Sequence, residues 1–184
     1  MAGRVCPVWI GRLLASPIRR LIHNPETILG PYITNGMTVL EPGSAMGFFS
    51  LPAAKMVGPL GKVICLDLQE EMIRHLRKRA AKAGVADRIE TRVCSETSLQ
   101  LDDLKESADF AFAIAVAHEV PDQKRFFCEI YQTLKRGSFF LFAEPKGHVS
   151  LDDFAQSLKL ATTCGFTVQE EGKTRGSLRA LLKK

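Results

Sequence analysis

The stretch Val39-Leu40-Glu41-Pro42-Gly43-Ser44-Ala45-Met46-Gly47 decides the fold of this 184-residue chain. An apolar segment ends in an acid, and a loop of small residues then opens into a helix. Such a loop lets a ligand approach the backbone at the carboxyl edge of a parallel sheet, because small residues leave room there. The stretch therefore predicts a strand–loop–helix unit with a ligand site at the loop.

Short apolar runs alternate with longer helical patterns along the chain, which is typical of βα units around a parallel sheet. The third run mixes apolar and polar residues, as an edge strand would. We expect one α/β domain with a doubly wound, mostly parallel, seven-stranded sheet whose last strand is antiparallel. The expected strands are Met37–Glu41, Lys62–Asp67, Ile89–Cys94, Phe110–Val116, Ser138–Ala143, Phe166–Glu170 and Ser177–Leu182.

Three helices between these strands have recognisable ends. The first runs over residues 70–84, with acids in its first turn, where they suit the positive end of the helix dipole. The second follows Asp122 and is expected to stop at Gly137. The third opens at Ser150 with Asp153 completing a capping box, and it ends near residue 165. Pro52 predicts that the helix after the loop kinks or starts late.

Composition limits the class of protein. The chain is 46% apolar and 24% charged, which fits one globular domain. Its longest apolar run, Phe110–Ala117, has eight residues, whereas a membrane-spanning helix needs about 20. The net charge of +5 comes from basic ends, at residues 1–25 and 172–184. We interpret these ends as solvated termini rather than as a nucleic-acid surface.

Five cysteines stand at positions 6, 65, 94, 128 and 164. The count is odd and no CxxC pair is present, so we expect small buried thiols in a reducing, cytoplasmic protein. The pattern also disfavours a zinc site, and we expect no metal ligands.

Residues 1–23 have no place in the expected sheet. Ser16-Pro17 and Asn24-Pro25 each pair an N-cap residue with proline at the first helical position, so this region predicts two or three short helices. Its apolar residues are interpreted as a lid over the pocket of a domain spanning residues 24–184, with Cys6 and Trp9 able to touch substrate. The alternative is a helix packed only for stability.

The ligand is narrowed down by spacing and charge. Dinucleotide folds use G-x-G-x-x-G, but the residue five positions after Gly43 is Phe48, which is too bulky for close helix–strand packing. Glu41 carries the wrong charge for a pyrophosphate, whereas a ligand with an amino group and a sulfonium would tolerate it. Asp67 ends the next strand, where an acid accepts hydrogen bonds from ribose hydroxyls.

This pattern resembles the class I S-adenosylmethionine-dependent methyltransferases, whose first motif is an acid followed by x-G-x-G-x-G. Residues 41–47 match that motif except that Ala45 replaces the middle glycine. Ala108-Asp109-Phe110 and the turn at residues 134–138 are similar to later motifs. The small-molecule branch, which includes the quinone-biosynthesis enzymes, looks most similar. The resemblance implies a Rossmann-like methyltransferase fold that binds S-adenosylmethionine.

The resemblance also implies cofactor-binding positions, with Asp67 at the ribose. After strand three the family often has an aspartate near the adenine amino group, and here Ser95 or Glu96 would substitute for it. The candidate cofactor-binding residues are Glu41, Gly43, Ser44, Ala45, Gly47, Asp67, Leu68, Ser95, Glu96 and Ala115.

Substrates of doubly wound sheets lie beyond the carboxyl ends of the central strands. Strands four and five lead there into two histidines and two glutamates, which are the candidate catalytic residues. Histidine titrates near neutrality, so it could remove a proton from an acceptor or hold an anionic acceptor. For Glu119, capping of the next helix is an equal alternative. The four are His118, Glu119, Glu144 and His148.

The expected reaction is direct displacement of the sulfonium methyl by a small-molecule acceptor. The family's N/D-P-P-Y/F motif for planar amino nitrogens is replaced by Ala-His-Glu-Val at residues 117–120, which disfavours that chemistry. Two alternatives stay open. One is an RNA methyltransferase that uses the basic ends, and the other is a non-catalytic S-adenosylmethionine-binding protein.

Overall fold

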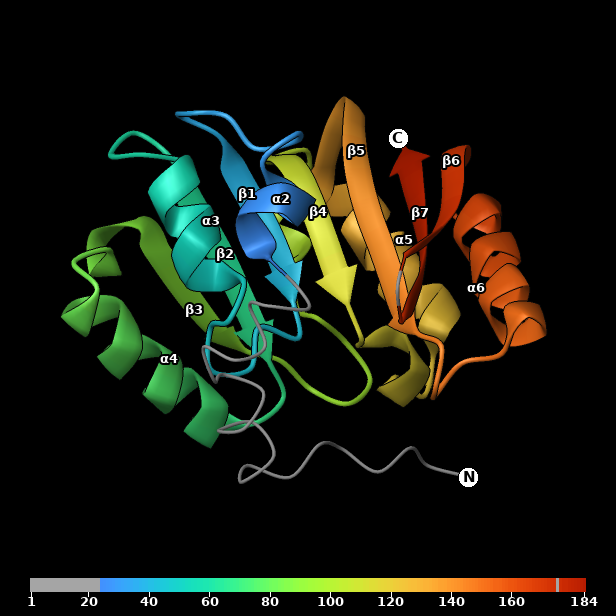
Figure 1. Ribbon diagram of the computed structural model, residues 1–184, viewed down its shortest axis with the longest axis horizontal. Helices are drawn as coiled ribbons and strands as arrows, with labels where there is room; N and C mark the ends of the chain where they lie inside the picture. Colours follow the sequence, from blue (N-terminus) through green and yellow to red (C-terminus); the bar gives the residue numbers. More distant parts are fainter. Residues whose placement is uncertain (1–23, 175) are drawn as a thin grey trace. The chain divides into compact units, whose positions relative to one another are not determined.

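The computed structural model describes residues 24–174 and 176–184 (Figure 1). The expected lid of residues 1–23 lies outside this range. The chain divides into two compact units, one extending to Cys94 and the other running from Ser95 to Lys184. No helix within the described ranges is long and apolar enough to cross a membrane.

The first unit alternates helices with parallel strands, as the sequence predicted. Its strands lie in the order β3-β2-β1, so the third strand is at an edge, as its mixed composition indicated. The helices α3 and α4 pack against β2. The elements are α2 (Pro25–Leu29), β1 (Thr38–Pro42), α3 (Ser50–Met56), β2 (Lys62–Asp67), α4 (Glu70–Lys82), the 3-10 helix Ala86–Arg88 and β3 (Ile89–Val93).

The second unit contributes the other four strands of the seven-stranded sheet, in the order β4-β5-β7-β6. The β4–β5 pair is parallel, and β7 runs antiparallel to both of its neighbours. The predicted antiparallel last strand is therefore confirmed. The elements are β4 (Ala108–Ile114), α5 (Gln123–Thr133), β5 (Leu134–Pro145), α6 (Leu151–Thr163), β6 (Thr167–Thr174) and β7 (Ser177–Lys183), with 3-10 helices at Asp102–Leu104 and Ala117–Glu119.

Helix starts follow the predicted capping residues. Asn24 accepts hydrogen bonds from the first backbone N–H groups of α2, and Ser150 and Asp153 form the expected capping box of α6. Asp122 caps α5 by accepting from the Arg125 N–H at 2.9 Å, so Glu119 is not the cap. Because α3 begins only at Ser50, the late start predicted from its proline is confirmed.

The predicted end of α5 at Gly137 is wrong. The helix ends at Thr133, and Leu134 already pairs with Ala108 in the sheet. Gly137, with φ of +80°, instead lies in an irregular part of β5, where the register with β4 shifts. Pairing with β4, which is distant in the sequence, overrides the helical pattern after Thr133. The sheet satisfies the backbone N–H and C=O groups that a longer helix would otherwise have satisfied.

Aromatic rings form the core between β5 and its two helices. Phe127 of α5 lies edge-on to Phe142, with ring centroids 5.3 Å apart, and Phe154 of α6 stacks on the same ring at 5.1 Å. Phe140 shares this face of β5, because alternate residues of a strand point to the same side. Both helices therefore cover one face of the second unit's strands.

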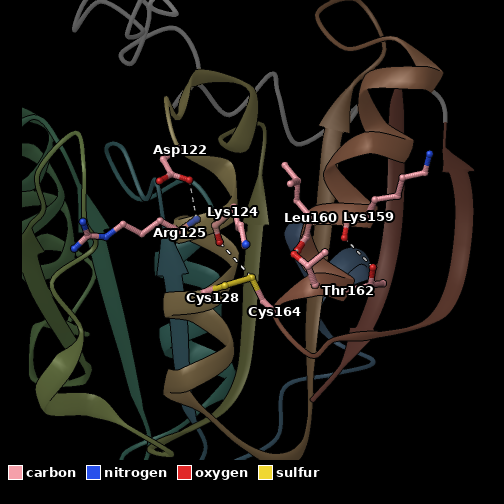
Figure 2. The surroundings of a disulfide bond; sticks show 9 residues. Asp122, Lys124, Arg125, Cys128, Lys159, Leu160, Thr162 and Cys164 are labelled. Carbon is pink, nitrogen blue, oxygen red and sulfur yellow. Dashed lines mark hydrogen bonds between the residues drawn. A yellow bond between two sulfur atoms is a disulfide. The ribbon is translucent and has the colours of Figure 1, made fainter.

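A disulfide joins Cys128 of α5 to Cys164, which caps the end of α6 (Figure 2). The expectation of small buried thiols is wrong for this pair, whose Cα atoms are 4.9 Å apart. The sequence separation of 36 residues gives no sign that the two helices pack side by side. Cys65 is a buried free thiol, as expected, and Cys94 is half-buried.

This crosslink yields a stability prediction. A disulfide that closes a loop of 36 residues stabilises by about 4 kcal/mol in the chain-entropy treatment. Cys128→Ala is expected to lower the free energy of unfolding by that order, measured in urea. Dithiothreitol should destabilise the wild type but not the variant, and Cys94→Ala serves as the control for loss of a cysteine outside this pair. An oxidised wild type that is indifferent to dithiothreitol would contradict the prediction.

Candidate functional site

The loop after β1 is held by one carboxylate at the end of β2. Asp67 accepts the Ala45 N–H on Oδ2 and the Gln69 N–H on Oδ1, each at 2.9 Å. An ionised carboxylate has about four lone-pair positions, so two hydrogen bonds leave capacity for ribose hydroxyls. Asp67 is 9% exposed, and burial raises the pKa of its carboxyl.

The backbone of this loop takes conformations that favour glycine. Gly43 and Gly47 have φ of +72° and +81°, and Ala45 has φ of +45°. The alanine that replaces the family's middle glycine therefore adopts the left-handed conformation despite its side chain, at a cost of order 1 kcal/mol. Ala115, after β4, is also left-handed, with φ of +61°. Both alanines were predicted to lie against the cofactor.

Ser44 offers an unused hydrogen-bonding group in the same loop. Its hydroxyl is buried and has no hydrogen-bond partner, although its N–H donates to the Leu66 carbonyl at 2.8 Å. Buried polar atoms almost always have partners. An orphaned hydroxyl next in the chain to Ala45, whose N–H Asp67 holds, fits a loop built to receive a polar ligand, and S-adenosylmethionine supplies suitable groups.

Glu41 lies in the interior rather than free in the loop. It is 3% exposed and accepts hydrogen bonds from the Ser50 hydroxyl and, at 3.7 Å, from the Cys65 thiol. Burial raises the pKa of its carboxyl from 4.5 to about 8. At neutral pH this group therefore carries mostly a proton, and the sequence alone did not indicate its two partners.

The four candidate catalytic side chains come together at the carboxyl ends of β4 and β5. Glu144, 2% exposed, accepts the Ala117 N–H on Oε1 at 2.8 Å and holds Nδ1 of His118 on Oε2 at 2.5 Å. Nε2 of His118 lies 3.9 Å from Oε1 of Glu119. The ring of His148 lies edge-on to that of His118, with centroids 5.5 Å apart.

Glu144 shifts the pKa of His118. The hydrogen bond between the Glu144 carboxylate and the His118 ring raises the pKa of His118 above the usual 6.5, although burial of the ring acts in the opposite direction. A carboxylate on Nδ1 fixes the ring orientation and leaves Nε2 for a substrate. The arrangement can therefore accept a proton or, in its protonated form, hold an anion.

Of the remaining candidates, Leu68 follows Asp67 and is half-buried, while Ser95 is half-buried and Glu96 is exposed. Ser95 and Glu96 lie on a short turn after β3, closed by an isolated bridge between Ser95 and Ser98. The described residues contain no cluster of three or more possible metal ligands.

A seven-stranded sheet with β7 antiparallel, a small-residue loop after β1 and an acid at the end of β2 define the class I methyltransferase fold. The family model "Methyltransferase domain" matches residues 33–178. The chain therefore belongs to this family, that of the class I S-adenosylmethionine-dependent methyltransferases, as its sequence motifs predicted.

Two curated relatives and a solved structure are similar to the chain. The chain is 34% identical over 122 residues to an arsenite methyltransferase of Halobacterium salinarum. The matched residues are 66% of this chain and 28% of that protein. The chain is 25% identical to sterol methyltransferase-like 1 of Botryococcus braunii, over 79% of the chain and 36% of that protein. The chain thus spans about a third of these relatives' lengths. A SAM-dependent methyltransferase structure from Aquifex aeolicus shares the fold, with a TM-score of 0.83, 24% identity and coverage of 96% and 99%.

Gly47 provides a test of the loop's geometry. A Cβ at Gly47 would lie 2.1 Å from Cδ1 of the buried Leu76, whereas one at Gly84, which also has positive φ, would meet open space. Gly47→Ala is expected to cost about 1–3 kcal/mol more than Gly84→Ala, because only the former overpacks the core. Equal losses in urea unfolding would show that the backbone angle alone matters.

Glu41 provides a pH test. A carboxyl whose pKa is raised on folding is protonated in the folded state and ionised in the unfolded state between pH 4.5 and about 8. The free energy of unfolding of the ligand-free protein should therefore fall as pH rises through this window, by up to about 1.4 kcal/mol per pH unit. Glu41→Gln is expected to flatten this slope, and Glu171→Gln, at an exposed position, should not. Parallel profiles for all three proteins would refute the assignment.

Proposed function

We propose that this protein transfers a methyl group from S-adenosylmethionine to a small acceptor that loses a proton in the reaction. The observation that carries the proposal is the contact between Nδ1 of His118 and the buried carboxylate of Glu144. Such a pair presents Nε2 as a proton acceptor of raised basicity, next to Glu119 and His148.

When bound, S-adenosylmethionine supplies a methyl group on a positively charged sulfur, already activated for direct displacement. In this proposal Asp67 holds the ribose, and the loop at residues 43–47 receives the amino-acid end through its backbone and the Ser44 hydroxyl. Nε2 of His118 accepts the acceptor's proton, while Glu144 orients the ring and balances the imidazolium charge. The protein's part is chiefly orientation and proton transfer.

The acceptor class is supported by similarity rather than by geometry. The relative from Halobacterium salinarum is named for arsenite, and the sequence motifs resemble those of quinone-biosynthesis enzymes. Arsenite and a hydroquinone are therefore the first two acceptors to test. We further propose a cytoplasmic location, where reducing conditions would open the Cys128–Cys164 disulfide to a pair of thiols, and a lid formed by residues 1–23.

Asp67 is the first test of the cofactor assignment. Calorimetric titration with S-adenosylmethionine and with its demethylated product should show binding, and NAD should show none. Asp67→Ala is expected to abolish that binding, because it removes both the ribose acceptor and the hydrogen bond to the Ala45 N–H. Unchanged affinity in this variant would refute the ribose assignment, and NAD binding in the wild type would refute the cofactor.

His118 and Glu144 are tested by the pH dependence of turnover. In the wild type, kcat/KM should rise with pH through an apparent pKa above 6.5, as the imidazole loses its proton. His118→Gln should lower kcat by about 100-fold or more, and Glu144→Gln should move the apparent pKa downward. His75→Gln, on α4, is the matched control and should keep the wild-type rate. A pH profile that Glu144→Gln leaves in place would overturn the proposed role of the pair.

A further inference from the structure

The strand β6 forms an open edge of the second unit. In the part of the chain that the structure describes it pairs with β7 alone, because it is the last strand in the order β4-β5-β7-β6 (Figure 1). The register between the two strands shifts between Val168 and Glu170, and the pairing is regular from residue 170 to residue 174. An edge strand keeps a row of backbone N–H and C=O groups without a sheet partner. This regular segment can therefore accept one more strand.

Two charges of opposite sign stand on this edge, at alternate positions. Glu171 and Lys173 are exposed, and neither is in an ion pair with any residue in the ranges 24–174 and 176–184, whereas Glu170 is paired with Arg179 at 2.8 Å. Alternate residues of a strand point to the same side, so the two free side chains share one face of the sheet. The edge therefore carries a glutamate and a lysine that are both available to a partner strand.

Gly172, between these two charges, defines a two-fold register. If two copies of β6 pair antiparallel about Gly172, Glu171 of each copy stands opposite Lys173 of the other. Moving the centre one residue back would set Glu171 against itself, and moving it one residue forward would set Lys173 against itself. Opposite charges that face each other across a strand pair are stabilising, and like charges are destabilising. The edge therefore favours one register for a second copy, with a glycine at the axis, where a side chain would meet its own copy.

An exposed apolar side chain lies beside the same charges. Leu151, the first residue of α6, is 57% exposed. It lines a groove of about 340 Å³ together with Glu171 and Lys173. The buried side chains of Phe154 and Leu178 also line this groove and make it partly apolar. A lone exposed leucine is ordinary on a protein surface, but here it adjoins an open strand edge that carries a self-complementary pair of charges.

We propose that the chain forms a two-fold dimer through the β6 edge, with a second copy of itself as the partner. Residues 170–174 of the two copies run antiparallel, so backbone hydrogen bonds supply affinity and two Glu171–Lys173 pairs fix the register. The second copy also covers part of Leu151. Because the same patch is used on both copies, the contact closes after two chains. The inference does not depend on methyl transfer, so it and the proposed function can fail separately.

The experiment is sedimentation velocity on the purified full chain over a concentration series, at low ionic strength, where exposed charge pairs are least screened. The wild type is expected to show a monomer–dimer equilibrium. Glu171→Lys and Lys173→Glu each turn two attractive contacts into two repulsive ones, so each should weaken the dimer by about tenfold or more. An equal mixture of the two variants again sets opposite charges against each other at both contacts. The mixture should therefore associate about as tightly as the wild type.

Lys105→Glu is the matched control, because it makes the same charge change at another exposed position of the second unit, before β4. It should dimerise as the wild type does. Lys173→Gln carries the test if thermal unfolding shows that a charge-reversed variant does not fold, and it should weaken the dimer by about threefold.

Four results would overturn the inference. The first is a wild type that stays monomeric, as it would if the edge serves a different chain. The second is a dimer that the charge-reversed variants, or Lys173→Gln in their place, leave as strong as before. The third is a mixture of the two folded variants that associates no more tightly than either alone. The fourth is a dimer that Lys105→Glu weakens as much as Lys173→Glu does.

Discussion

The carboxylate of Asp67 is the contact on which the first unit's ligand loop depends. One oxygen holds the N–H of Ala45 and the other holds the N–H of Gln69, so a single side chain ties the loop after β1 to the start of α4. The left-handed backbone of Ala45 costs free energy, and the hydrogen bond from its N–H to Asp67 stabilises that conformation. The remaining acceptor positions of the same two oxygens suit a ligand that carries hydroxyl groups.

Two further carboxylates are buried, and the protein deals with their charge in different ways. Glu41 keeps its proton at neutral pH because burial raises its pKa to about 8. Glu144 instead faces His118, whose pKa it raises. A buried charge is costly unless it is neutralised or paired, and these are the two available solutions. The first gives a structural acid in the interior, and the second gives an ionisable pair at the ends of β4 and β5.

Helix α5 contributes more to holding the second unit together than the sequence of the helix suggests. Its inner face carries Phe127 against the rings of β5, and Cys128 crosslinks it to the end of α6. Glu129, the next residue, holds the turn after β3. Three consecutive residues thus serve the core, the neighbouring helix and a loop, because successive positions on a helix point about 100° apart.

The sequence by itself determined the strand–helix alternation, the loop at residues 43–47 and the acid at Asp67, because hydrophobic period, small residues and caps act locally. Only the tertiary structure decided which distant groups meet. The disulfide, the Glu129 contacts and the early end of α5 all depend on partners far apart in the chain. The protonated state of Glu41 likewise follows from burial, which no local pattern encodes.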